Sequence, residues 1–154
     1  MIIYQINEPG TLDYQEVLTF LKETDDLVIP SLSTLVSLEE YSHKITSKAV
    51  IFTARDDEKI VGLSAIYFNK APGFSYSTMM MVKREYQLQE MIGVELSKRV
   101  KDYIKRNDSA GIRFEIRKSN QPLVRYHLRR GARIVSESVY PGTDVVSLLM
   151  ELSY

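Results

Sequence analysis

The middle third of the chain, residues 79–132, limits the possible folds most, because its residue pattern changes in a defined order. An apolar run predicts a buried strand over residues 76–82, and apolar residues that recur every four positions predict a helix over residues 93–106. Residues 112–117 alternate between apolar and charged types, which predicts another strand. A short helix follows, and Gly131 ends it as the residue after the C-cap. This order of elements indicates a mixed α/β domain.

The N-terminal part of the chain predicts one strand and two helices. Residues 1–6 alternate well enough for an opening strand. Residues 12–22 place apolar side chains on one helical face, with Thr11 or Asp13 as the N-cap. Ser37 has a glutamate three residues later, which is typical of a capping box and predicts the start of a second helix.

Two pairs of β-forming segments complete the pattern. Residues 50–54 and 60–68 are rich in β-formers around a polar turn, so they predict an antiparallel hairpin. Residues 132–139 and 143–149 predict two closing strands. The whole pattern contains seven strands and four helices, with no repeat or linker. We expect one domain that spans residues 1–154.

The composition argues against several classes of function. The chain of 154 residues has 20 Lys and Arg against 20 Asp and Glu, so no overall positive field indicates nucleic-acid binding. Cysteine is absent and the two histidines, His43 and His127, stand far apart, which argues against disulfides and a metal site. No apolar run approaches the roughly 20 residues of a membrane span, and the N-terminus lacks a secretory pattern. We therefore expect a cytoplasmic protein without a metal, membrane or nucleic-acid partner.

The loop between Val82 and Leu96 is the most site-like segment of the sequence. It joins a buried strand to a long helix, and the first turn of such a helix leaves backbone N–H groups free. These groups and the helix dipole favour phosphate binding. The only glycine of the loop is Gly93.

At this point the sequence resembles the GNAT superfamily of N-acetyltransferases. In that family a strand is followed by Gln/Arg-x-x-Gly-x-Gly/Ala at the start of a long helix. After the next strand come an asparagine, a tyrosine seven residues later and a glycine four residues beyond it. Several spaced features carry the resemblance in this chain: Val82, Glu85, Tyr86, Gln87, Gly93, Phe114, Glu115, Ile116, Asn120, His127 and Gly131.

The resemblance covers the whole chain and implies a fold, an activity and a set of site residues. The implied fold is a single mixed, mostly antiparallel sheet of about seven strands flanked by about four helices. The implied activity is transfer of an acetyl group from acetyl coenzyme A to a primary amine of a small molecule, with a homodimer through the terminal strands as one family-level option. The residues expected to hold the coenzyme are Met80, Met81, Val82, Gln87, Leu88, Gln89, Glu90, Met91, Ile92, Gly93, Val94 and Asn120.

Two registers of the phosphate loop are open. If Gly93 is placed at the second glycine of the family, Met91 stands at the first glycine and Leu88 at the Gln/Arg position. A gapless count from Val82 instead keeps Gln87 at the Gln/Arg position. In both registers a glycine is replaced where the backbone approaches phosphate closely. Glu90 lies in or beside the loop in both, and a repulsion of about 1–4 kcal/mol would weaken pyrophosphate binding.

His127 and Glu115 are the expected catalytic residues. The resemblance implies that His127, at the position of the family's tyrosine, assists the departing thiolate. If they lie close in space, Arg125, Arg129 and Arg130 would lower the pKa of its imidazole. Glu115 could accept a proton from the incoming ammonium; its structural alternative is an ion pair with Arg113 or Arg117.

Structural interpretations remain open for two further residues, and one alternative function remains open for the chain. Gly93 could serve close packing of helix on sheet, and Asn120 could be only an N-cap. The alternative function is a non-catalytic module that binds a partner or another acyl carrier through an eroded phosphate loop.

Overall fold

The computed structural model describes residues 1–88 and 91–154. In the described chain four α-helices and seven strands are formed, in the order that the pattern predicts. The strands are β1 (Ile2–Asn7), β2 (Val50–Asp56), β3 (Lys59–Tyr67), β4 (Ser75–Val82), β5 (Gly111–Arg117), β6 (Arg133–Val139) and β7 (Val146–Ser153). The helices are α1 (Tyr14–Thr24), α2 (Leu38–Lys48), α3 (Ile92–Arg106) and α4 (Gln121–Arg129).

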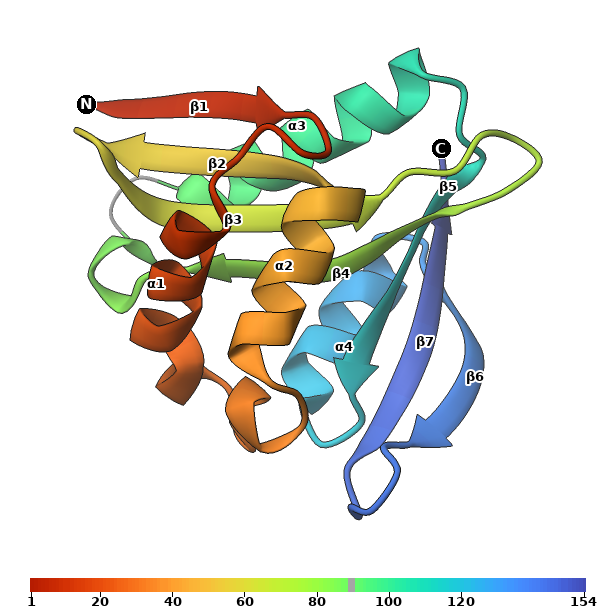
Figure 1. Ribbon diagram of the computed structural model, residues 1–154. Coiled ribbons are helices and arrows are strands. Elements are labelled where there is room, and N and C mark those ends of the chain that lie inside the picture. The colour runs from red at the N-terminus through yellow and green to blue at the C-terminus, as the bar shows by residue number, and fades with distance from the viewer. Residues whose placement is uncertain (89–90) are drawn as a thin grey trace. The chain divides into compact units, whose positions relative to one another are not determined.

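All seven strands belong to one mixed sheet in the order β1-β2-β3-β4-β5-β7-β6 (Figure 1). β1 pairs antiparallel with β2, β2 with β3, β5 with β7, and β6 with β7. β4 and β5 pair in parallel, over three residues of each strand, and this pairing ends at Ser77 and Phe114. The predicted fold class, a single mixed sheet of seven strands with four helices, is therefore confirmed.

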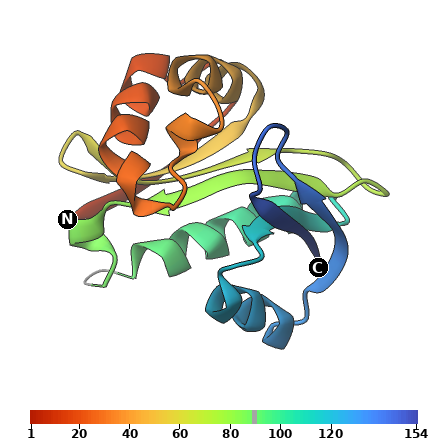
Figure 2. The ribbon, with the colours of Figure 1, turned by 90° about the horizontal axis from the view of Figure 1, so that it is seen from below.

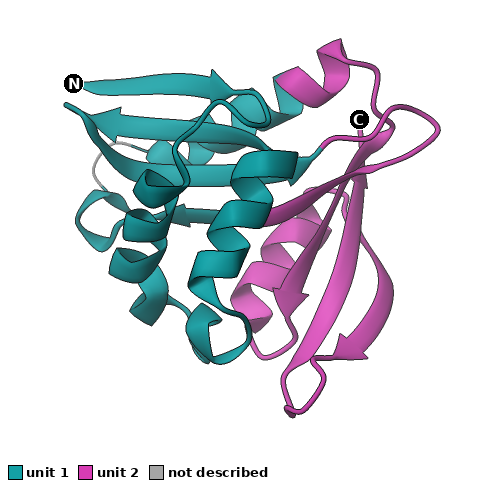
Figure 3. Cartoon of the chain, viewed as in Figure 1, with its two compact units in different colours: residues 1–67, 79–102 teal, residues 68–78, 103–154 magenta. Residues whose placement is uncertain are grey.

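The contacts within the chain group into two compact units (Figure 3). Unit 1 comprises residues 1–67 and 79–102, and unit 2 comprises residues 68–78 and 103–154. Each unit therefore consists of two separate stretches of sequence, and both β4 and α3 contribute to both units. The expectation of a single domain over the whole chain stays a prediction.

In unit 1 helices cover both faces of the strands (Figure 2). α1 and α2 pack on one face, where Val17, Phe20 and Ile45 join Ile51 and Leu63 in a buried core. The start of α3 packs on the other face, as the position of Gly62 shows. A Cβ at Gly62 would lie 2.8 Å from Cγ2 of Ile92 and 3.2 Å from Cδ1 of Leu96. Burial on both faces explains why β2 and β3 are apolar along most of their length.

In unit 2, α4 covers one face of β5 and β7. Val124, Ala132, Leu148 and Met150 form the buried core, and Phe114 packs against it. β6 is the edge strand of the sheet and is exposed along its whole length. The predicted dimer through the terminal strands would involve this edge and stays a prediction.

Local capping patterns predicted three helix starts and one helix end. Asp13, one of the two predicted caps of α1, accepts a hydrogen bond from the backbone N–H of Gln15. Ser37 accepts one from the N–H of Glu40, which confirms the predicted N-cap of α2. Asn120 caps α4 in the same way, and Gly131 follows that helix with a left-handed φ of 95°. The segment between α1 and α2 contains two short 3-10 turns, Asp25–Leu27 and Leu32–Thr34. Among the helices that the structure describes, none is long and apolar enough to cross a membrane.

Candidate functional site

The end of β4 and the start of the predicted phosphate loop are held by hydrogen bonds within unit 1. The side-chain amide of Gln87 donates to the carbonyl of Val82 at 3.0 Å, and the backbone N–H of Lys83 donates to the carbonyl of Val61 at 2.8 Å. The hydroxyl of Tyr86 donates to Asp56 at 2.6 Å. The family-like Glu-Tyr-Gln segment therefore folds back onto the sheet, and the side chain of Gln87 caps the strand end.

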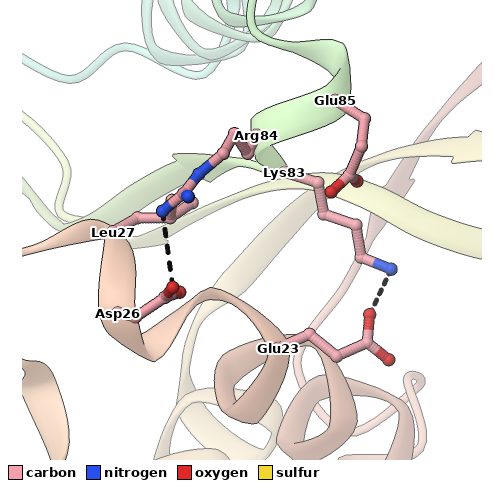
Figure 4. A pocket seen from close by; sticks show the side chains of 6 residues that line it. All are labelled: Glu23, Asp26, Leu27, Lys83, Arg84 and Glu85. Atoms are coloured by element: carbon pink, nitrogen blue, oxygen red, sulfur yellow. Dashed lines mark hydrogen bonds and ion pairs between the residues drawn. The ribbon is translucent and has the colours of Figure 1, made fainter.

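A charged pocket of about 350 Å³ lies beside this strand end (Figure 4). Lys83 forms an ion pair with Glu23, and Arg84 forms one with Asp26 at 3.3 Å. Leu27 and Glu85 complete the lining. Both cations of the pocket already have carboxylate partners, so the pocket offers phosphate no uncompensated positive charge.

The end of the loop has an unusual backbone conformation at Met91. Its φ is 53°, in the left-handed region that favours glycine, and α3 begins at the next residue. The Met91 side chain is 61% exposed, so burial does not impose this conformation. One of the two registers places Met91 at the family's first glycine, and the structure shows a glycine-like backbone there. Gln89 and Glu90, two of the predicted coenzyme-binding residues, lie outside the described residues.

Gly93 has room around it. A Cβ at this position would meet nothing closer than Cε of Met80 at 3.8 Å and Cγ2 of Val82 at 3.9 Å, which are ordinary contacts. Close packing of α3 on the sheet therefore requires a glycine at Gly62 and not at Gly93. The structural interpretation of Gly93 as a packing glycine is wrong, and close approach of a ligand remains as a reason for glycine there.

The other predicted residues of the loop and strand divide into inward and outward groups. Ile92 is fully buried and anchors the first turn of α3, whereas Val94 is exposed. Leu88 is 92% exposed and Met80 is 44% exposed. Met80 therefore does not belong to the closed core that the apolar pattern predicts for the end of β4. Met79 and Met81, its neighbours, pack against the core beneath α1 and α2, and Val82 is buried.

His127 lies on α4 in unit 2 and packs against Phe114 of β5. The two ring centroids are 4.6 Å apart. Burial lowers the pKa of the His127 imidazole from its ordinary value of 6.5, and the nearby guanidinium of Arg130 lowers it further. The imidazole is therefore neutral at pH 7 and can donate one N–H.

Glu115 lies on β5 and has a partner that the sequence did not predict. The hydroxyl of Tyr140, just after β6, donates a hydrogen bond to Oε2 of Glu115 at 3.3 Å. Burial and the charge of Glu115 raise the pKa of the Tyr140 phenol, so the phenol remains a donor. Arg113, one of the two arginines expected to pair with Glu115, binds Glu151 at 2.7 Å instead.

Tyr140 was not predicted as a site residue; it lies in the segment between β6 and β7. Tyr140 and Glu115 are 25 residues apart in the sequence, and no local sequence pattern predicts that they make contact. Predicting this pair would have required the register of β5 with β7 and of β7 with β6.

The two predicted catalytic residues lie on opposite faces of β5. Neighbouring residues of a strand point to opposite sides, and Phe114, which contacts His127, is adjacent to Glu115. The structure therefore does not bring His127 and Glu115 together. Among the described residues no group of three His, Cys, Asp or Glu side chains could hold a metal ion.

No family model matches the sequence, and no curated protein matches it. Solved structures do match. The ribosomal-protein-S18-alanine N-acetyltransferase from Escherichia coli is 16% identical, with a TM-score of 0.73 over 98% of this chain and 94% of the other. A GNAT family acetyltransferase from Elizabethkingia anophelis, solved with acetyl-CoA bound, is also 16% identical, with a TM-score of 0.70 over 99% and 98%. NAA60 from Arabidopsis thaliana, solved with a bisubstrate analogue, is 14% identical, with a TM-score of 0.71 over 100% and 99%.

The chain has the GNAT fold. The match extends over nearly the whole length of each of these structures. The chain departs from the family pattern at His127 on α4 and in the loop, where the register decides between Leu88 with Met91 and Glu90 with Ile92.

Proposed function

We propose that the protein is a cytoplasmic enzyme that transfers an acetyl group from acetyl coenzyme A to a primary amine of a small molecule. The observation that carries the proposal is the junction between the loop and α3. A left-handed backbone at Met91 leads into the first turn of α3, and Gly93 in that turn carries no side chain, although a Cβ there would meet only ordinary contacts. Free N–H groups at a helix start with room for close approach suit a pyrophosphate.

The coenzyme would be held by the residues of unit 1 that the sequence predicts. The backbone of Met80, Met81 and Val82 would bind the pantetheine arm, because the pairing of β4 with β5 ends before these residues. The loop and the start of α3 would bind the pyrophosphate. Gln87 would act indirectly, since its side chain holds the carbonyl of Val82 and so fixes the strand end.

Acetyl transfer requires one proton to leave the amine and one to reach the thiolate. The amine nitrogen bonds to the acetyl carbon as the carbon–sulfur bond breaks. Glu115 would accept the proton of the ammonium, and Tyr140 would orient its carboxylate. His127, neutral at pH 7, would donate a hydrogen bond to the departing sulfur, and the thiolate would take its proton from water. Because these groups lie on opposite faces of β5, they would serve the two ends of the reaction separately.

Calorimetric titration of the protein with acetyl coenzyme A tests the proposal. We expect saturable binding at micromolar to millimolar ligand, and release of free coenzyme A when an accepted amine is added. The absence of detectable heat at millimolar ligand would exclude coenzyme binding and with it the proposed activity.

A second candidate function is a non-catalytic module, and the carboxylate at Glu90 favours it. Glu90→Gly removes this charge, while Glu85→Gln removes a carboxylate just before the loop and serves as the matched control. If coenzyme binding is found only in the Glu90→Gly variant, the native chain is the non-catalytic module. If the native chain binds and Glu90→Gly strengthens binding by about tenfold or more, the repulsion is real but tolerated.

A further inference from the structure

Arg117 is the arginine of β5 that forms no ion pair with any residue that the structure describes. Its Nη1 atom is buried and has no hydrogen-bond partner among the residues that the structure describes. Burial also lowers the pKa of its guanidinium from 12.5, although an arginine remains charged at pH 7. A buried donor without a partner is costly, by about 1–3 kcal/mol, and such groups in folded proteins call for an explanation.

The neighbours of Arg117 supply hydrogen-bonding groups but no ion pair. Arg117 stands opposite Ser147 of β7 in the antiparallel register. Tyr140 lies near Ser147 and Arg117. A hydrogen bond with Ser147 and the charge of Arg117 each lower the pKa of its phenol, whereas burial and Glu115 raise that pKa by more. Arg113, also on β5, differs from Arg117 because it forms an ion pair with Glu151. Arg133 of β6 pairs with the same carboxylate.

Glu115 and Arg117 project from the same face of β5, because they are two residues apart in a strand. Their Cα atoms are therefore about 7 Å apart. Tyr140 lies near both residues. Its hydroxyl donates a hydrogen bond to Glu115, and the charge of Arg117 lowers the pKa of its phenol. This face thus presents one carboxylate for a cation and one guanidinium for an anion, side by side.

We propose that Arg117 binds the carboxylate of the acetyl acceptor, so that the acceptor is a small amine that carries a carboxylate, such as a free amino acid. The proposal rests on the acetyl transfer proposed above and specifies its acceptor. The Nη1 atom is covered by the protein, so the carboxylate would meet the remaining N–H donors of the partly exposed guanidinium, and Glu115 receives the ammonium of the same molecule. A phosphate would place more negative charge beside Glu115, which favours the singly charged carboxylate. Unit 2 also carries ten Lys and Arg against five Asp and Glu, and this net charge of +5 attracts an anionic acceptor.

The test compares amines that differ only in the carboxylate. Alanine, leucine, glutamate and lysine are assayed for coenzyme A release beside alaninamide, leucinamide, the α-amide of glutamate and lysinamide. We expect kcat/KM for at least one free amino acid to exceed that for its amide tenfold or more. In the Arg117→Met variant, which keeps the aliphatic stem, KM for the acid should rise 10- to 100-fold, while kcat/KM for the amide should fall several-fold less than kcat/KM for the acid.

The matched control is Arg129→Met, an identical change at an exposed arginine of α4 in the same unit. It should alter neither substrate. Equal use of acids and amides by the native protein, or an equal loss on both in Arg117→Met, would overturn the assignment of Arg117. Circular dichroism of the variants separates this result from misfolding.

A second readout separates the assignment from the proposed reaction. The same amino acids are titrated calorimetrically into the protein without coenzyme and into Arg117→Met. Binding that requires Arg117, in a protein that fails to bind acetyl coenzyme A, would support the carboxylate site and exclude the reaction. Binding of acetyl coenzyme A with acetylation only of amines that lack a carboxylate would support the reaction and exclude the carboxylate site.

Discussion

The imidazole of His127 has an environment that defines its chemical role. The ring packs on Phe114 and lies close enough to the Arg130 guanidinium to feel its charge, and both burial and this charge disfavour protonation. A tyrosine at this position would carry its proton at pH 7 with a pKa near 10. A neutral histidine also offers one N–H, and in His127 burial and the charge of Arg130 keep the imidazole neutral. His127 is thus better suited to hydrogen-bond a sulfur than to act as a strong acid.

The first prediction concerns the titration of His127. We expect its midpoint below 6.5 in the folded protein, because the largest cause, burial, disfavours the imidazolium. Arg130→Met should move the midpoint part of the way back, since it removes the smaller cause only. NMR of the imidazole resonances against pH, assigned with a His43→Asn variant, measures both values. A midpoint at or above 6.5 would contradict the described environment.

Met91 gives a second prediction at the scale of one residue. A left-handed backbone costs a residue with a side chain about 1–2 kcal/mol, and glycine avoids this strain. Met91→Gly should therefore raise the free energy of unfolding by about 0.5–1 kcal/mol, and coenzyme binding should be kept or strengthened. Leu88→Gly is the control, because Leu88 is also exposed to solvent but its φ is not positive. Urea denaturation should show a small loss of stability for that variant; a loss for Met91→Gly as well would remove the argument from strain.

At the scale of elements, α3 is positioned by one glycine and is open to ligand at another. Gly62 on β3 allows Ile92 and Leu96 to pack against the sheet, and both of these side chains are fully buried. Gly93 on the helix itself meets only ordinary contacts. The packing of α3 on the sheet therefore depends on Gly62, whereas Gly93 is available for close approach of a ligand.

The third prediction uses this separation. Gly62→Ala places a methyl 2.8 Å from Cγ2 of Ile92, so it should lower the free energy of unfolding by about 1–3 kcal/mol. Gly93→Ala should leave stability unchanged or raise it by up to about 1 kcal/mol, since alanine favours the helix. The order should reverse in titrations with acetyl coenzyme A, where Gly93→Ala weakens binding. Equal stability losses in both variants would mean that Gly93 also serves packing.

The fourth prediction concerns Glu151, which links three strands of unit 2. Its side chain is 5% exposed and accepts hydrogen bonds from Arg113 of β5 at 2.7 Å and Arg133 of β6 at 2.8 Å. The bond from Arg133 is the largest cause that holds the pKa of Glu151 below 4.5. Because the folded pKa is the lower one, the stabilisation is complete above about pH 4.5 and is lost as the pH falls through the folded value.

Glu151→Gln should therefore lower the free energy of unfolding by about 1–3 kcal/mol at pH 7 and by much less at acid pH. Urea denaturation at several pH values measures the difference. Glu137→Gln breaks an exposed pair with Lys118 and is the control, with an expected change of about 0.5 kcal/mol or less. A constant difference across the pH range would show that the charge of Glu151 is not what joins the strands.

How far the sequence predicts each element depends on whether the cause is local. The starts of α1, α2 and α4 follow from Asp13, Ser37 and Asn120, because a cap acts within three residues. The left-handed Met91 could not be predicted, because only Gly, Asn and Asp commonly signal that conformation. The Tyr140–Glu115 bond also depends on strand register across 25 residues, which no local pattern encodes.

At the scale of the whole molecule, the two units share elements instead of being joined by a linker. The chain passes from unit 1 to unit 2 after Tyr67, returns at Met79 within β4, and leaves again after Asp102 within α3. Neither unit can unfold alone without breaking one strand and one helix in their interior. Helix and strand formation are cooperative, so such breaks are unfavourable.

We therefore expect the described chain to unfold in a single cooperative transition, as a single domain does. The amide NMR signals of β2 in unit 1 and β7 in unit 2 should disappear at the same urea concentration, coincident with loss of far-ultraviolet circular dichroism. Gly62→Ala in unit 1 and Glu151→Gln in unit 2 should each shift both sets of signals together. If either substitution moves only the signals of its own unit, the two units are independent domains, and the expectation of one domain across all 154 residues is wrong.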